Sequence, residues 1–176
     1  MPPRDFTAVY DEHVWHVYGF FAYRLRGRAD CEDLTQMTFE RALRAWGRYD
    51  ATRAGVRTWL MAIAHNLLVD HLRADRSATQ DPVDELPEHA VPGVADRHDL
   101  GPAPDLERAL AELSSREREL IALRFGGDLS GPEIAALTGL SLANVQQILS
   151  RSLRHMRASI EAARGAGERV TVRGPA

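Results

Sequence analysis

Apolar side chains recur at the three- and four-residue spacing of amphipathic helices over three segments in the N-terminal part of the chain. This pattern predicts helices over about residues 5–26, 29–46 and 58–76. Gly27 follows the first segment and is predicted to end that helix, because glycine accepts the left-handed backbone of a helix C-cap. The stretch 48–57 contains a glycine and has no period, so it is predicted to be a loop.

Shorter helices with explicit start signals are predicted in the last third of the chain. Ser114 with Glu117, and Ser130 with Glu133, match the capping box, in which a serine and a glutamate three positions later bind free amides at the start of a helix. Ser141 is a third candidate N-cap. The chain is therefore predicted to be all-α.

Residues 77–104 separate the two helical regions and have a different composition. They contain five prolines, two glycines and one arginine against six acids, which gives this stretch a net charge of −5 in a chain whose net charge is −3. Proline and like charge keep a linker extended. We therefore predict two small helical domains joined by a flexible acidic linker. The only candidate strand is RVTVR, residues 169–173, in the tail.

Residues 130–157 combine the features of a helix-turn-helix. Ala135 is small enough for two helices to approach, Gly139 can take the left-handed backbone of the turn, and Val145 can anchor the second helix. At about 100° per residue, one stripe of that helix carries Leu142, Val145, Leu149, Leu153, Met156 and Ile160. The opposite side carries Asn144, Gln147, Ser150, Arg151, Arg154 and Arg157. Amides and guanidinium groups bind base edges and phosphates, so this side is predicted to contact DNA; a merely solvated polar face is the alternative.

Composition excludes several other classes of protein. All 22 lysine or arginine positions are arginine, whose planar fork suits phosphates and bases. No apolar run approaches the roughly 18 residues of a membrane span, and the N-terminus lacks the apolar core of a secretory signal, so a cytoplasmic location is expected. Cys31 is the single cysteine, and His13 and His16 alone make a weak metal site. No motif supports an enzyme, and neither a cofactor nor a small-molecule substrate is expected.

Three stretches resemble one family, the extracytoplasmic-function (ECF) sigma factors. Residues 30–42 read DCEDLTQMTFERA, close to the family pattern D-x-E-D-L-x-Q-E-T-F-x-x-A. Residues 58–73 read TWLMAIAHNLLVDHLR, where the family carries W-L-x-x-I-A-x-N-x-x-x-D-x-x-R. Residues 113–157 are similar to the family's domain four, including L-S-x-x-E-I-A in near-standard form. The three motifs occur in the family's order and spacing.

The resemblance implies a protein that binds core RNA polymerase, directs it to promoter DNA and helps to open the duplex. Residues 1–76 would be sigma domain two, which recognises the −10 element, and residues 105–164 would be sigma domain four, which recognises the −35 element. Residues 165–176 would form a tail. An anti-sigma factor that buries both domains is a further partner found in this family, and no membrane association is expected.

The resemblance also implies roles for individual residues. Binding of core polymerase falls to Asp33, Gln36 and Phe39. Contacts to the −10 element fall to Arg53, Arg57, Trp59, Asn66, Arg73 and Arg76, with a purely structural role for Trp59 as the alternative. Contacts to the −35 element fall to Ser141, Asn144, Gln147, Ser150, Arg151 and Arg154.

Three positions depart from the family pattern. Met37 stands where glutamate is usual, and Gln146 and Ile148 stand where basic residues are common. Fewer cations on a recognition helix lower non-specific DNA affinity and its salt dependence, so an unusual −35 preference is expected. The competing hypothesis is a free-standing helix-turn-helix regulator that binds duplex DNA as a dimer.

Overall fold

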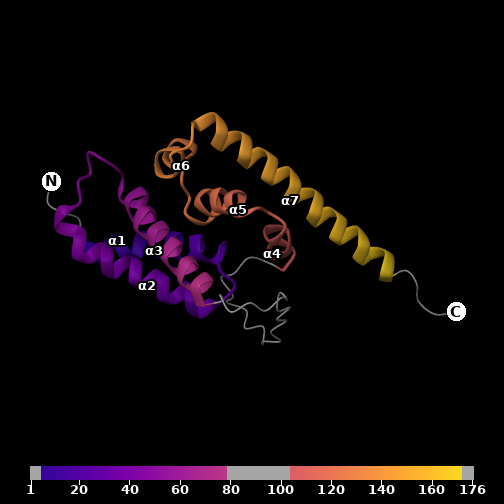
Figure 1. Cartoon of the computed structure of the whole chain (residues 1–176), viewed down its shortest axis with the longest axis horizontal. Helices are drawn as coiled ribbons and strands as arrows, with labels where there is room; N and C mark the ends of the chain where they lie inside the picture. Colours follow the sequence, from indigo (N-terminus) through magenta and orange to yellow (C-terminus); the bar gives the residue numbers. More distant parts are fainter. Residues whose placement is uncertain (1–4, 79–103, 172–176) are drawn as a thin grey trace.

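The computed structural model describes residues 5–78 and 104–171, with side chains over 5–74 and 104–165. All regular structure in these ranges is helical (Figure 1). The first half comprises α1 (Phe6–Ala22), α2 (Arg28–Ala45), the short 3₁₀ turn η1 (Trp46–Arg48) and α3 (Val56–Ala78). The second half comprises α4 (Pro104–Ala111), α5 (Ser115–Ile121), the π-helical turn η2 (Ala122–Gly126), α6 (Gly131–Thr138) and α7 (Leu142–Thr171). The all-α prediction is confirmed, and no described helix is long and apolar enough to span a membrane.

The turn between α1 and α2 corrects one prediction. Helix α1 ends at Ala22, earlier than expected, and Gly27 does not cap its C-terminus. Gly27 is instead the N-cap of α2, with extended backbone angles of φ −85° and ψ 123°. The backbone amides of Arg24 and Leu25 both bond to the carbonyl of Phe21, so the chain has already left the helix before the glycine is reached.

The capping and turn chemistry of the second half is as predicted. Both capping boxes form, with Ser114 and Glu117 starting α5 and Ser130 and Glu133 starting α6. Gly139 ends α6 in the left-handed conformation at φ 72°, a backbone that costs glycine nothing. The helix-turn-helix is therefore formed by α6 and α7.

Helix α7 corrects two further predictions. It runs to Thr171, so residues 169–171 are helical rather than part of a strand, and residues 172 and 173 lie outside the described residues. Within it, Leu142 and Leu153 are exposed, because they lie at the edge of the buried stripe, while Ser152 lies at its centre and is fully buried. The predicted linker, residues 77–104, lies almost wholly outside the described residues.

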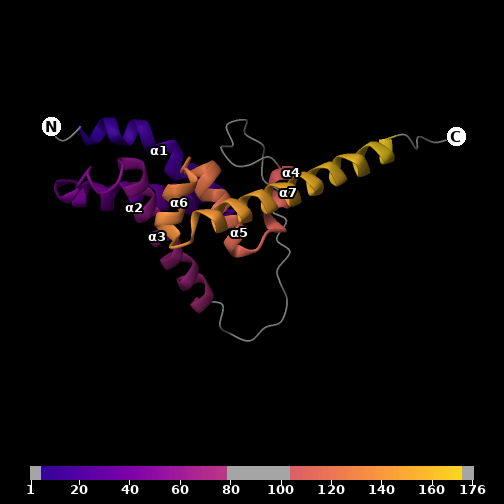
Figure 2. The same cartoon turned by 90° about the horizontal axis from the view of Figure 1, so that it is seen from above.

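The two halves share one hydrophobic core. A single cluster of buried side chains joins Phe20 and Leu60 of the first half to Leu123 and Ile134 of the second half. Helix α1 packs on η2, and α5 lies between α3 and α7 (Figure 1). The C-terminal part of α7 extends beyond the rest of the molecule in both views (Figure 2). The two domains predicted from the sequence are thus packed together in this structure.

Candidate nucleic-acid interface

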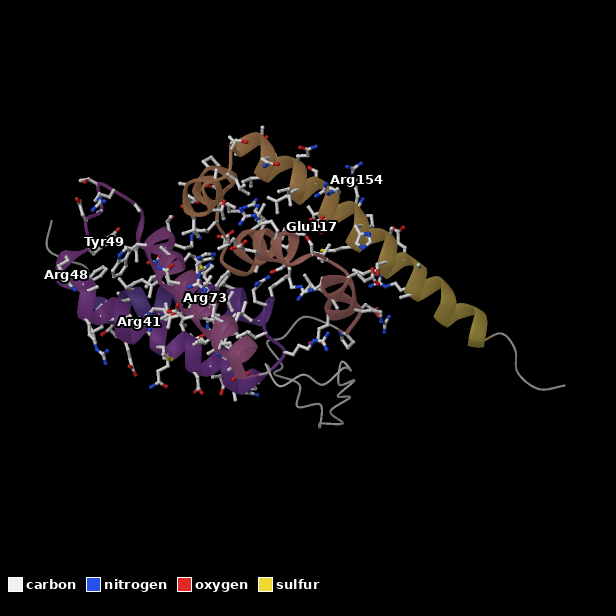
Figure 3. The ribbon with its side chains drawn as sticks, in the orientation of Figure 1. Arg41, Arg48, Tyr49, Arg73, Glu117 and Arg154 are labelled. Carbon is white, nitrogen blue, oxygen red and sulfur yellow. The ribbon has the colours of Figure 1, made fainter. Side chains whose placement is uncertain are left out.

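The polar side of α7 is exposed and lies opposite the buried side. Val145 is completely buried and Met156 nearly so, which fixes the orientation of the helix. The residues predicted to read the −35 element are all exposed: Ser141, Asn144, Gln147, Ser150, Arg151 and Arg154. Figure 3 shows Arg154 on the outer side of α7. The structure therefore brings five of these six residues together on one accessible side of α7. Ser141 directly precedes the helix, and its hydroxyl accepts a hydrogen bond from the backbone amide of Asn144 at 3.2 Å.

Glu117 orients one of these arginines. The Arg151 Nε on α7 donates a hydrogen bond to the Glu117 Oε1 on α5 at 3.3 Å. Glu117 also closes the capping box of α5, and the hydrogen bonds from Ser114 lower the pKa of its carboxyl. The sequence identified Glu117 only as a cap, because a helical wheel does not show what lies beside the helix.

An aromatic cluster lies at the end of α2 and the start of α3. The rings of Trp46 and Tyr49 stack at 5.1 Å with an interplanar angle of 3°, and Tyr49 lies 5.0 Å from Trp59. The Tyr49 hydroxyl donates to the carbonyl of Ala54 at 2.9 Å and holds the intervening loop closed. A cleft of about 1040 Å³ opens beside Trp46 and Tyr49. Aromatic faces of this kind can stack on unpaired bases.

The residues predicted to contact the −10 element differ in their exposure and in the element that carries them. At about 100° per residue, Trp59, Asn66 and Arg73 lie within roughly 40° of one another around α3. Asn66 and Arg73 are exposed, while Trp59 is half-buried in the aromatic cluster. Arg53 is exposed in the preceding loop. Arg76 belongs to α3, but its side chain lies outside the described residues.

Arg57 is the exception, because it faces the second half of the molecule. Its guanidinium forms a 2.5 Å ion pair with Asp128, and the neighbouring Thr58 hydroxyl donates to Glu133 at 2.6 Å. Its side chain is 34% exposed. The sequence contained no sign of this pairing, since the partners lie about seventy positions apart.

The predicted polymerase-binding residues lie on α2. Asp33 and Gln36 are exposed, and Gln36 donates to Glu40 at 3.1 Å. Phe39 is only 5% exposed and packs edge-on against Tyr10, so most of its surface belongs to the core. A direct contact between Phe39 and polymerase stays a prediction, and Phe39 is one of the residues that line a groove between α1 and α2.

That groove contains residues the sequence reasoning missed. Its volume is about 550 Å³, and it is lined by Trp15, which is 62% exposed, and by Leu43, which is 57% exposed. Trp15 lies off the apolar stripe of α1. A large aromatic side chain out of phase with the buried stripe is the one feature of the sequence that indicated an exposed apolar surface here. Such exposed apolar groups around a groove are typical of a protein-binding surface.

Comparison with known families identifies both halves. The sigma-70 region 2 family matches residues 9–78, and the sigma-70 region 4 family matches residues 104–156. The ECF RNA polymerase sigma factor SigC of Mycobacterium tuberculosis is 34% identical over 149 residues, covering 84% of this chain and 77% of SigC. The chain belongs to the ECF RNA polymerase sigma factors.

Other members of the family are similar over most of this chain. The ECF sigma factor BldN of Streptomyces coelicolor is 31% identical over 158 residues, which cover 85% of this chain and 58% of BldN. Among solved structures, the sigma factor RpoE of Bartonella quintana in complex with the anti-sigma factor NepR has a TM-score of 0.70 at 20% identity, covering 90% of this chain and 98% of RpoE. CnrH in complex with the cytosolic domain of CnrY has a TM-score of 0.60 at 22% identity, covering 89% of this chain and 88% of CnrH. These structural likenesses establish the fold.

As a sigma factor, the protein directs promoter-specific initiation of transcription. The competing hypothesis of a free-standing regulator is not favoured, because the region 2 match covers the first half and has no place in a simple helix-turn-helix protein. The region 4 match ends at residue 156, within α7, so the rest of that helix lies beyond the matched part of the family.

Proposed function

We propose that the two halves of this sigma factor divide promoter recognition as their regions suggest. Residues 1–76 act as domain two, which binds core polymerase and the −10 element, and residues 105–164 act as domain four, which binds the −35 element. The observation that carries this proposal is the polar side of α7, which is fully accessible and lies opposite the core. The role is non-catalytic and is carried out in the cytoplasm.

The −35 contact is proposed to involve the exposed side of α7. Asn144 and Gln147, in the first turns of the helix, are placed to read base edges in a major groove. Arg151 and Arg154 are one and two turns further along and are placed for phosphates. Glu117 limits the freedom of Arg151 and so reduces the entropy lost when that side chain binds.

The −10 contact is proposed to involve one face of α3 and the adjoining aromatic cleft. Asn66 can bind a base edge, and Arg73 can bind a backbone phosphate. Tyr49 and Trp46 present a stacking surface beside the cleft, where an unpaired base gains roughly 1–3 kcal/mol. This gain offsets part of the few kcal/mol that unpairing costs.

Core polymerase is proposed to bind α2 and the groove between α1 and α2. Asp33 and Gln36 supply the polar contacts, and Trp15 and Leu43 supply exposed apolar area. The same apolar surface suits an anti-sigma factor, which we propose as a competing partner. One sigma factor of similar fold has been solved with an anti-sigma factor bound.

Run-off transcription from a genomic fragment library tests the proposal. Purified core polymerase with this protein is expected to give discrete transcripts that neither component gives alone, and aligned start sites yield the −10 and −35 sequences. Asp33→Arg combined with Gln36→Ala is expected to abolish these transcripts and core binding in a pulldown, while leaving duplex DNA binding unchanged.

Arg44→Ala is the matched control on α2. Arg44 is exposed and pairs with Glu40, one turn away, so its loss is expected to leave both activities unchanged. Tight, sequence-specific binding of duplex DNA by the protein alone, with no polymerase-dependent transcript, would contradict the proposal.

A further inference from the structure

A groove of about 520 Å³, the arginine groove, lies where the turn after α1 meets α4 and α5. It is lined by arginines from all three segments: Arg24, Arg26, Arg108 and Arg118. Among its described lining residues, Glu107 is the single carboxylate, and none is a residue proposed above to contact DNA or polymerase. Figures 1 and 2 show α4 near the C-terminal end of α1, away from the loop before α3. The arginine groove is therefore separate from the surfaces already described.

Hydrogen bonds to backbone carbonyls hold two of these guanidinium groups in place. The Arg118 Nε donates to the carbonyl of Leu110 at 2.9 Å, and its Nη2 donates to the carbonyl of Leu113 at 3.0 Å. The Arg24 Nη1 donates to the carbonyl of Ser115 at 2.9 Å. A ligand that binds these two groups therefore loses little side-chain entropy, because the protein has already ordered them.

Both groups keep N–H donors that the described part of the chain does not satisfy. The Nε of Arg24 is buried and has no hydrogen-bond partner among the described residues. The hydrogen bonds that Arg118 forms with described residues come from its Nε and Nη2, which leaves its Nη1 free to bind a ligand. A buried donor without an acceptor costs free energy, and an acceptor bound beside it removes that cost.

The positive charge around the groove is only partly compensated. Within the described residues, Arg24, Arg26 and Arg118 form no ion pair with a carboxylate. Glu119 lies close enough to Arg24 to favour its charged form, but the carboxylate oxygens of Glu119 are already bonded to two other side chains. Four guanidinium groups against one lining carboxylate leave an excess of positive charge in the groove.

Burial and like charge act on the same guanidinium groups. Burial lowers the pKa of Arg24; the charge of Glu119 opposes this effect, and that of Arg118 adds to it. Burial also lowers the pKa of Arg118, and the charge of Arg26 lowers it further. Arginine stays protonated at neutral pH, so these charges remain and repel one another. An anion in the groove would relieve both the repulsion and the loss of solvation.

We propose that the arginine groove binds a small soluble ligand with two or more linked phosphoryl groups, such as the polyphosphate part of a nucleotide. Each guanidinium fork can bind two phosphate oxygens, so the four forks suit more than one phosphoryl group. The volume of the groove falls within the range of roughly 300–1,000 Å³ that is typical of small-molecule sites. A nucleic-acid backbone is the other source of linked phosphates, but it favours cations spread along a surface rather than gathered in one short groove.

Calorimetric titration of the full-length protein with sodium tripolyphosphate tests the proposal. One saturable site is expected at about 150 mM salt, where exposed charges are screened over about 8 Å. Inorganic phosphate is expected to bind about tenfold more weakly or less, because one phosphoryl group cannot engage all the arginines. Tripolyphosphate is also expected to raise the thermal midpoint of unfolding as its concentration rises, since it binds the folded protein.

Two exposed arginines, one from each half, can be changed with little effect on the fold. Arg26 lies in the turn after α1, and Arg108 on α4 pairs with Asp105 at 3.6 Å. Arg26→Gln and Arg108→Gln are each expected to weaken tripolyphosphate binding about fivefold. Arg44→Gln is the matched control, because Arg44 is also exposed and also pairs with an acid one turn away, but lies at the far end of α2. It is expected to change affinity by less than about twofold.

A competition experiment separates the two sources of linked phosphates. A short single-stranded DNA of randomised sequence is added to the protein saturated with tripolyphosphate, at the same total concentration of phosphate groups. The DNA is expected to leave tripolyphosphate bound, because its own contacts are proposed on other surfaces. Circular dichroism of each variant, with and without the ligand, checks that the helices are intact.

Three results would overturn the inference. Absence of saturable tripolyphosphate binding would show that the groove is not a phosphate site. Equal weakening in Arg44→Gln and in the two groove variants would indicate general attraction between charges rather than a site. Displacement by DNA, with the same loss of DNA affinity in Arg26→Gln and Arg108→Gln, would assign the groove to a nucleic-acid backbone.

Discussion

The two predicted DNA-binding surfaces differ in how much of each is accessible. Every predicted −35 residue, on α7 or directly before it, is exposed. Arg151 pairs with Glu117 of α5 and is still 62% exposed. At the start of α3, Arg57 and Thr58 are bonded to acids of the other half. One predicted surface is open to solvent, and part of the other is in contact with the second half of the molecule.

The difference arises from how each surface is built. The α7 face needs only one helix with its apolar side buried, so its exposure follows from the helix-turn-helix itself. The surface predicted to bind the −10 element combines the loop before α3, the end of α2, the start of α3 and the aromatic cluster. It lies where the second half packs on the first. A surface assembled from several elements can be covered by a rearrangement of neighbours, whereas the outer face of a single helix is harder to hide.

The largest predicted effect concerns the core that the halves share. Phe20 is completely buried next to Gly126, so Phe20→Ala is expected to destabilise the protein by about 3–5 kcal/mol. Because one cluster spans both halves, urea unfolding followed by circular dichroism and by aromatic fluorescence is expected to show one coincident transition. Phe125 is 48% exposed, and Phe125→Ala, the matched control, is expected to cost about 0.5 kcal/mol or less. Two separate transitions in the wild-type protein would show that the halves fold independently.

The second largest predicted effect concerns the exposed side of α7. Arg151→Ala is expected to lower −35-dependent run-off transcription about tenfold, equivalent to about 1.4 kcal/mol of lost DNA contact, while core binding in a pulldown is unchanged. Glu117→Gln keeps the cap but weakens the bond that orients Arg151, so a smaller loss is expected. Equal loss of core binding and transcription in Arg151→Ala would contradict the division of roles between the halves.

A smaller effect concerns the acids that join the halves. Burial acts to raise the pKa of Glu119, but hydrogen bonding to His65 outweighs burial and lowers this pKa overall. Burial also acts to raise the pKa of Glu133, and the hydrogen bonds from Ser130 and Thr58 lower it overall. A carboxyl with a lowered pKa in the folded state stabilises the fold above its unfolded value of 4.5, and this stability is lost as the pH falls through the folded pKa. Unfolding free energy, measured by urea titration, is therefore expected to decline as the pH falls below about 4.5.

Glu119→Gln provides the control for this pH dependence. It removes one of the two carboxylates and is expected to make the decline shallower. An unchanged slope in this variant would show that the interdomain bond to His65 is not its source.

The smallest effect concerns Cys31, which reports on the first half alone. Burial, followed by the nearby Asp30 and Glu32, raises the pKa of its thiol to about 11, so little reactive thiolate exists at neutral pH. Labelling with a thiol reagent at pH about 7 is expected to be slow in the native protein and fast in urea. Fast labelling of the native protein at this pH would contradict the burial of Cys31.

Much of the fold and part of the site could be predicted from the sequence. The capping boxes at Ser114 and Ser130, the left-handed Gly139 and the buried Val145 depend on residues within a few positions of each other, and all are confirmed. The exposed side of α7 follows from the same local periodicity. The error at Gly27 is also local, because the chain leaves α1 before reaching the glycine that was expected to end it.

The sequence by itself determined the helices, the helix-turn-helix and the family, because periodicity, capping and short motifs act over a few residues. Only the tertiary structure decided which predicted DNA contacts are accessible. Arg57 meets Asp128, and Gly19 meets Gly126, across separations that no local pattern encodes. The physical reason is that packing between distant segments depends on shape and charge complementarity of whole surfaces, which exist only once both halves have folded.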